Sequence, residues 1–208
     1  MLCEKCKKNK GEINLPYLGH ILCRRCFCNL IQRRVKKEIK QKKIIEENEK
    51  VLLIDDKSIE ARISEILINS IYKKVKLTKK QVKGFSLGQI DKPTILLIKK
   101  EKISKVVIPW NLDKEINYFT ECVFSGNKTS KIGHYNEQNI IFVKLLRNVL
   151  ESECDLLAEF NNIDIKRNQE KDKKIDDIKG LINRINKKHC ETKFSLLKSI
   201  DKLNKIIK

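Results

Sequence analysis

VLLIDDKSIEAR, residues 51–62, runs from four consecutive apolar residues into a helical pattern, and this stretch decides the fold. The run 51–54 predicts a buried strand, and apolar residues recur at helical spacing over 59–71. Ser58 is suited to cap that helix, with Asp56 as a competitor. Such a turn commonly holds a phosphate, because free backbone N–H groups and the helix dipole point there. This turn instead offers the carboxylates of Asp55 and Asp56 and has no glycine.

Further strands and helices are expected on both sides of this stretch. Residues 74–78 (KVKLT), 93–100 (PTILLIKK) and 105–110 (KVVIPW) are predicted strands, the second of them strongly buried. Residues 111–127 predict a helix capped from Asp113, and residues 139–160 predict one long helix. After residue 164 isoleucine and leucine recur at three-and-four spacing, which predicts two basic amphipathic helices. Strands separated by helical patterns favour a reduced α/β layer with parallel pairing.

The charge of the chain is concentrated at its two ends. The 208 residues carry a formal net charge of +19, with +8 in residues 1–50, +8 in residues 165–208 and only +3 between them. Basic ends around a near-neutral centre are typical of a protein that binds a polyanion, most simply nucleic acid. Lysine enrichment from an AT-rich genome is the alternative, and it explains the clustering poorly. The sequence shows no apolar signal segment and no membrane-spanning run, so a cytoplasmic protein without membrane contact is expected.

Four cysteines near the N-terminus have the spacing of a metal site. Cys3, Cys6, Cys23 and Cys26 form two C-x2-C pairs, and four thiolates are the usual ligands of structural zinc. His20 and Cys28 lie near enough in sequence to replace a ligand, although the set is complete without them. An iron–sulfur cluster is the less favoured occupant. Little apolar material lies between the pairs, so the metal is expected to supply much of the folding energy of this segment.

A basic amphipathic helix is predicted directly after the second cysteine pair. Phe27, Ile31, Val35 and Ile39 share one helical face. The cations expected mostly on the opposite, exposed side are Arg33, Arg34, Lys36, Lys37 and Lys40.

Several of these segments, in this order, resemble a known family. CEKC (3–6), LCRRCF (22–27), the basic helix, VLLID (51–55) and VVIPWNLDKEINYFTEC (106–122) are similar to the cytosolic tRNA 2-thiolation proteins, which contain a PP-loop ATP-pyrophosphatase domain. The resemblance covers roughly residues 3–125. Catalytic members carry S-G-G-x-D-S after the first strand, where this chain has IDDKS (54–58). The family's central C-x-x-C, which holds an iron–sulfur cluster together with a later cysteine, is absent and leaves Cys122 without those partners.

The resemblance therefore implies the non-catalytic branch of the family, the tRNA 2-thiolation protein 2 subunits, in a shortened form. Such a subunit is not an enzyme; it forms a heterodimer with a catalytic PP-loop subunit and binds tRNA. It supports 2-thiolation of the wobble uridine with sulfur from a ubiquitin-like carrier. Structural zinc is expected, without ATP binding and without an iron–sulfur cluster. The degenerate nucleotide loop is Asp55, Asp56, Lys57 and Ser58, with both acids as helix-start residues. The residues expected to contact tRNA phosphates are Arg24, Arg25, Arg33, Arg34, Lys36, Lys37 and Lys40.

The resulting prediction is an α/β protein in four parts. Residues 1–30 form a zinc-binding knuckle module and residues 31–50 a basic helix linker. Residues 51–163 form a degenerate PP-loop-like domain with a parallel sheet, related to the adenine nucleotide alpha hydrolase-like fold. Residues 164–208 form a basic helical extension.

Two other functions remain open from the sequence. An active tRNA sulfurtransferase of the same family would need a catalytic constellation, and none is evident. His134 follows Gly133 in a predicted loop and is expected at the surface. A stand-alone zinc-ribbon RNA-binding protein shares the cysteine and charge patterns and needs no partner.

Overall fold

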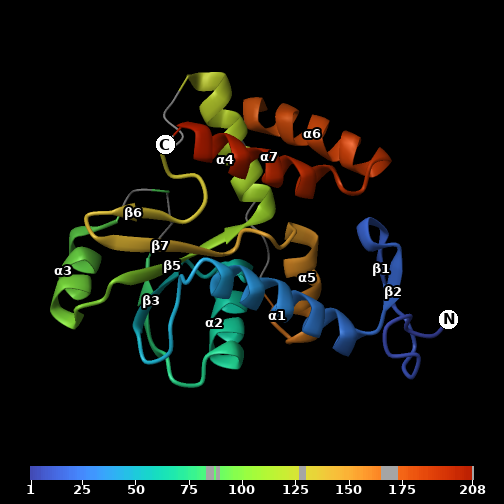
Figure 1. Cartoon of the computed structure of the whole chain (residues 1–208), viewed down its shortest axis with the longest axis horizontal. Helices are drawn as coiled ribbons and strands as arrows, with labels where there is room; N and C mark the ends of the chain where they lie inside the picture. The colour runs from blue at the N-terminus through green and yellow to red at the C-terminus, as the bar shows by residue number, and fades with distance from the viewer. Residues whose placement is uncertain (83–86, 88–89, 127–129, 165–172, 208) are drawn as a thin grey trace.

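A sheet of five strands forms the centre of the computed structural model, which describes residues 1–82, 87, 90–126, 130–164 and 173–207. The strand order is β4-β3-β5-β7-β6 (Figure 1). Neighbours β4 and β3, β3 and β5, and β5 and β7 are parallel, and β6 pairs antiparallel with β7 at one edge. The strands are β3 (Lys50–Asp55), β4 (Lys76–Gln81), β5 (Lys105–Asn111), β6 (Tyr135–Glu137) and β7 (Ile140–Leu146).

Strand β3 shows why the sheet is covered on both faces. Val51 and Leu53 belong to the apolar core on one face, while Leu52 and Ile54 belong to the core on the other. Side chains alternate along a strand, so a continuous apolar run requires two buried faces. The strand predicted at 51–54 is therefore confirmed as the centre of a parallel sheet. The expected strand at 74–78 is present as β4, shifted toward the C-terminus, and lies at the other edge of the sheet.

Helices cover the first face of the sheet. These are α1 (Arg24–Gln41), α2 (Ile59–Ile71) and α5 (Glu151–Phe160), whose apolar sides share one core with β3. Ser58 caps α2, because its Oγ accepts a hydrogen bond from the backbone N–H of Ala61 at 3.2 Å. Helix α1 buries Phe27, Ile31 and Val35 along one face, as predicted.

Residues 93–100 are not a strand, and this prediction is wrong. They lie in helix α3 (Lys92–Glu101), which packs on the second face of the sheet through Ile98. Asp91 begins the helix, since its Oδ1 accepts a hydrogen bond from the Thr94 N–H at 3.2 Å. Pro93 fits the first turn, where a missing N–H costs nothing. The apolar run is only half buried, and Leu96 is exposed.

The prediction of a single long helix at 139–160 is also wrong. This segment forms β7, a tight turn at residues 147–149, and then α5. The backbone N–H of Leu150 bonds to the side chain of Glu153 at 2.9 Å, which starts α5. Four apolar residues from 140 to 143 pair with β5 and β6, and a continuous apolar run of this length fits a buried strand as well as a helix.

Three helices form a layer at the end of the sheet (Figure 1). They are α4 (Leu112–Ser125), α6 (Lys173–Lys188) and α7 (Thr192–Ile207), and they share a small core around Leu112, Ile116 and Ile200. The cap of α4 is Asn111, whose Oδ1 accepts a hydrogen bond from the Lys114 N–H at 2.8 Å, and not Asp113 as expected. The two predicted C-terminal helices are confirmed.

The N-terminal segment packs against the start of α1, to one side of the sheet (Figure 1). It contains β1 (Ile13–Leu15), the short 3-10 helix η1 (Pro16–Leu18) and β2 (His20–Leu22), with β1 and β2 antiparallel. The buried side chains of Cys3 and Leu22 join the same core as α1 and β3. Helix α1 is continuous across the predicted boundary at residue 30; the four-part division stays a prediction. Among the described residues, no helix combines the length and apolarity needed to cross a membrane.

Candidate metal centre and nucleic-acid interface

The two cysteine pairs meet at the start of α1. Their four Sγ atoms, from Cys3, Cys6, Cys23 and Cys26, all lie within 4.8 Å of one another. The Sγ atoms of Cys6 and Cys23 are 3.9 Å apart. The first pair is shaped by a tight turn, in which the N–H of residue 7 bonds to the carbonyl of residue 3 at 2.7 Å. The second pair occupies the cap and first turn of α1. The thiols of both C-x2-C pairs therefore face one common point.

The four-cysteine group fits a metal in number, chemistry and spacing. Zinc with Zn–S bonds of about 2.3 Å would place four sulfurs roughly 3.8 Å apart. Four thiolates are equally the ligand set of an iron–sulfur cluster. Neither alternative ligand is required, because His20 Nδ1 is 2.8 Å from Glu4 and Cys28 is not among the four. A metal here would join β2 and α1 to the N-terminal turn.

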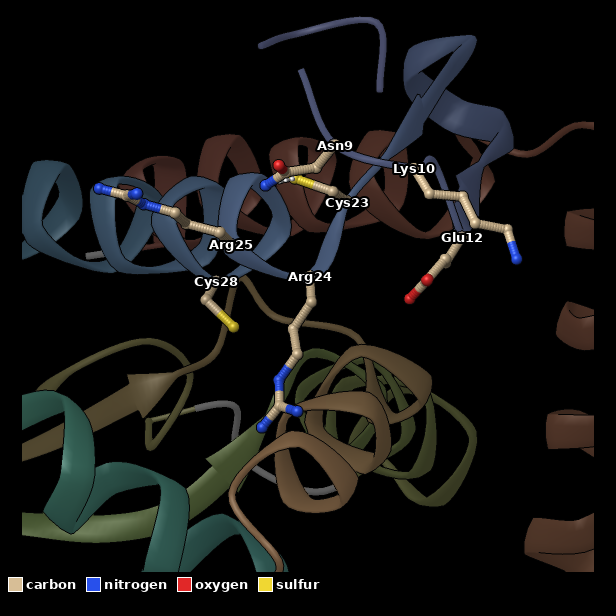
Figure 2. A pocket seen from close by; sticks show the side chains of 7 residues that line it. All are labelled: Asn9, Lys10, Glu12, Cys23, Arg24, Arg25 and Cys28. Atoms are coloured by element: carbon tan, nitrogen blue, oxygen red, sulfur yellow. Dashed lines mark hydrogen bonds between the residues drawn. The ribbon is translucent and has the colours of Figure 1, made fainter. Parts of the chain in front are cut away.

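A hollow whose lining holds three cations and one acid, Glu12, lies next to this group. It measures about 400 Å³ and is bordered by Lys10, Cys23, Arg24, Arg25 and Cys28. In Figure 2 the side chains of Arg24 and Arg25 leave the start of α1 in different directions. The guanidinium of Arg24 lies 4.9 Å from the ring centre of Phe160 on α5. Both arginines are nevertheless exposed, so they can meet an anionic partner.

The predicted basic face of α1 is present with one exception. Arg33, Lys36, Lys37 and Lys40 are exposed. Arg34 is not, because only 18% of its side chain is accessible.

The Arg34 side chain makes its hydrogen bonds inside the protein. Its guanidinium bonds to Glu153 at 2.7 Å, to the Tyr17 hydroxyl at 2.5 Å and to the carbonyl of Asn148 at 3.2 Å. Burial and the neighbouring Glu153 carboxylate raise the pKa of Tyr17, so its hydroxyl keeps its proton. This cluster joins η1, α1 and α5. The sequence did not predict this cluster, because Glu153 lies 119 residues from Arg34 along the chain.

In the turn after β3, the side chains of Asp55 and Asp56 accept hydrogen bonds from the backbone N–H groups of the turn itself. Asp55 Oδ1 accepts a hydrogen bond from the N–H of Lys57 at 2.9 Å, and Asp56 Oδ1 accepts one from Ser58 at 3.0 Å. Lys57 has a φ of +64°, the left-handed region that favours glycine. These N–H groups are the ones a phosphate would use at a strand-to-helix turn. The structure thus places both acids as residues that shape the helix start.

A buried ionic network, which sequence reasoning missed, lies at the carboxyl end of β7. Lys144 Nζ is 2.6 Å from Glu115 and 2.7 Å from the carbonyl of Lys131. It also lies 4.6 Å from the ring centre of Trp110. Burial lowers the pKa of Lys144 to about 8 despite the Glu115 charge. Glu115 also lies 3.2 Å from Arg147.

The network extends to α1 and α7. Arg147 bonds to Asp201 at 2.7 Å and to Glu38 at 3.3 Å. Burial alone would raise the pKa of Glu38, but the hydrogen bond to His134 and the nearby cations lower it to about 2. His134 is largely buried, with Nε2 3.3 Å from Glu38 and Nδ1 accepting from the Lys144 N–H, so its expected surface position is wrong. Burial lowers the pKa of His134.

The chain has an α/β fold with a mostly parallel sheet, and this fold is similar to that of a solved tRNA thiolase. One similar solved structure is U34-tRNA thiolase NcsA from Methanococcus maripaludis with its [4Fe-4S] cluster, at a TM-score of 0.79 and 15% sequence identity. The similarity covers 98% of this chain and 87% of that one. No protein-family model matches the chain. No curated protein matches it by sequence.

Two predictions from the sequence are contradicted by this similarity. The chain was expected not to be an enzyme, whereas the similar structure is a thiolase. It was also expected to hold no iron–sulfur cluster, whereas the similar structure carries one and the four-cysteine group here offers suitable thiolates. Both expectations rested on sequence motifs alone, namely the missing loop glycines and the missing central C-x-x-C.

Proposed function

We propose that the chain acts in the thiolation of tRNA, on the wobble uridine, in the cytoplasm. The observation that carries this proposal is the similarity of fold to a U34-tRNA thiolase over 98% of the chain. The net charge of +19 supports a polyanionic substrate. The four-cysteine group supports a metal-stabilised module beside the substrate.

The exposed cations of α1 are the proposed contacts to tRNA phosphates. Arg33, Lys36, Lys37 and Lys40 point to solvent along one side of the helix, and Arg24 and Arg25 continue this surface to the metal centre. Phosphate contacts of this kind position an RNA without reading its bases. Arg34 has an indirect role, since its bonds to Glu153 and Tyr17 hold α1 against the rest of the protein.

A PP-loop thiolation subunit is the proposed protein partner, with a ubiquitin-like protein as sulfur carrier. Each helix of the C-terminal layer leaves apolar side chains exposed, among them Phe124 on α4, Leu181 on α6 and Ile206 on α7. Exposed apolar groups on neighbouring elements are typical of a protein interface. A heterodimer through this layer leaves the basic side of α1 free for tRNA. Phe124→Ser should then weaken co-purification of such a subunit, and Leu96→Ser on α3 should not.

Depletion of the protein in its source organism tests the function directly. Mass spectrometry of nucleosides from purified tRNA should show loss of 2-thiouridine at the wobble position, restored by the wild-type chain. A Cys3→Ser/Cys6→Ser variant should restore it poorly, whereas Cys190→Ser should restore it fully. Unchanged 2-thiouridine after depletion would refute the proposal. Ribosomes as the main co-purifying particle, with normal thiolation, would instead favour the stand-alone RNA-binding protein.

A further inference from the structure

A groove of about 540 Å³ lies between η1, α1 and α7, separate from the hollow shown in Figure 2. Its apolar lining comes from Leu18, Leu30 and Leu197 together with the rings of Tyr17 and Phe194. Pockets for small organic groups fall in the range of roughly 300 to 1,000 Å³. The groove is therefore large enough for one nucleotide.

The aromatic floor of the groove is held rigidly. The ring centres of Tyr17 and Phe194 are 4.7 Å apart, with the ring planes tilted by 46°. The guanidinium of Arg34 lies 5.4 Å from the Tyr17 ring and 5.2 Å from the Phe194 ring. Tyr17 is fixed further by its hydroxyl bonds to Glu153 and Arg34. Rings that are already in place lose little conformational freedom when a flat partner binds.

The rim of the groove is strongly basic. Arg33 and Lys37 on α1 and Lys198 on α7 line it and are exposed, and Glu191 is the acid among its lining residues. An excess of cations around an apolar floor suits a ligand that combines a planar ring with a negative charge. An apolar peptide segment would bury the same floor but would gain nothing from the three cations. Arg33 and Lys37 also belong to the basic face of α1, so the groove is continuous with that face.

We propose that this groove binds an unpaired nucleotide of the RNA substrate, with the base on Tyr17 and Phe194 and the phosphate on the rim cations. Aromatic side chains beside basic ones form the usual binding surface for single-stranded RNA, because every base has a face that can stack. The proposal rests on the proposed tRNA function and adds a preference for unpaired RNA to it. A tRNA offers unpaired nucleotides in its loops and at its 3′ end. Paired regions would contact the cations of α1 alone.

Fluorescence anisotropy with two labelled RNAs tests the groove. The probes are a single-stranded ten-nucleotide oligouridine and a blunt-ended duplex of the same length, and each affinity is compared with that of the wild-type chain for the same probe. Phe194→Leu keeps an apolar side chain but removes the ring face, and it should bind the oligouridine about tenfold more weakly, the loss typical of one stacked base. Its affinity for the duplex should stay unchanged. Phe194→Trp should retain oligouridine binding, and Leu96→Ala, at an exposed apolar position on α3, should behave as wild type.

Circular dichroism and thermal unfolding show whether Phe194→Leu folds. If it does not, Lys198→Glu on the exposed rim is the second variant, and it should weaken oligouridine binding more than duplex binding. Oligouridine binding unchanged in a folded Phe194→Leu protein would overturn the proposal. So would equal losses for both probes with Lys198→Glu. If the wild-type chain binds tRNA with the expected salt dependence but not the oligouridine, only the groove proposal fails. If it binds no RNA at all, the proposed function fails with it.

Discussion

Replacing Glu115 with glutamine should destabilise the protein more than any other single surface or core carboxylate change that we consider. The Glu115 side chain is fully buried and receives hydrogen bonds from Lys144, from Trp110 Nε1 at 2.8 Å and from the Gly133 N–H at 2.6 Å. It also pairs with Arg147. Glutamine has the same shape and can still accept hydrogen bonds. The four donors are divided between the two oxygens of Glu115, so the amide nitrogen of glutamine would face two of them. The substitution therefore removes one negative charge beside two buried cations and two accepted hydrogen bonds.

The loss of stability depends on which partners Arg147 and Lys144 retain after the substitution. Arg147 retains Asp201 and Glu38, so its loss is partial. Lys144 is 0% exposed and retains the carbonyl of Lys131 and the aromatic rings around it, and its remaining contacts among the described residues include no carboxylate. Removing one partner of a buried pair costs about 3–5 kcal/mol. A domain has a total stability of about 5–15 kcal/mol, so the variant should approach the limit of folding at ambient temperature.

Urea unfolding followed by circular dichroism measures this change. Glu65→Gln is the matched control, because Glu65 on α2 pairs with Lys79 at 2.7 Å near the surface and should cost less than about 1 kcal/mol. Adding Lys144→Met to Glu115→Gln removes the unpaired charge and should recover part of the loss. A cost below about 1 kcal/mol for Glu115→Gln, or no recovery in the double variant, would refute this account of the network.

Three further predictions concern the metal, the pH dependence and tRNA. Cys26→Ser should abolish metal binding and Cys28→Ser should not, as measured by elemental analysis, with visible absorption separating an iron–sulfur cluster from zinc. The pKa of Glu38 is lowered from 4.5 to about 2, so its stabilisation is complete above pH 4.5 and is lost as the pH falls toward 2. Glu38→Gln should remove about 3 kcal/mol of that acid dependence in denaturation at several pH values, and an unchanged profile would contradict it. Arg33→Glu should weaken tRNA binding and lower the slope of log affinity against log salt by about one, whereas the same reversal at Lys100 on α3 should alter the slope less.

The sequence predicted those parts of the fold that depend on a few neighbouring residues. The strand at 51–54 and the cap at Ser58 follow from a few neighbouring residues, and so does the pairing of cysteines three apart. The prediction of a strand at 93–100 was wrong, because a short apolar run does not distinguish a strand from a helix. The decisive signal was Asp91 followed by Pro93, a helix start that lies partly outside the run.

The buried network could not be predicted, because its charges come from distant parts of the chain. Glu38, Glu115 and Asp201 lie on three different helices and meet only when the sheet and its covering helices are in place. The sequence shows them as ordinary acids on amphipathic helices. Lys144 gave a stronger signal, since it interrupts an otherwise apolar stretch, IIFVKLL. A lysine in a buried strand requires a carboxylate nearby, and that requirement could have directed attention to Glu115.

The outer strand β4 limits how copies of this protein can meet. Its sequence, KLTKKQ, places three lysines along the border of the sheet, where the described part of the chain adds no further strand, and Lys79 among them pairs with Glu65. A second copy that added its own β4 there would bring like charges together, and lysines on outer strands are a known protection against fibrous aggregation. Crowded conditions at neutral pH should therefore leave this border unpaired. Acetylation of those lysines would remove the repulsion and allow β4 of a second copy to pair with this border.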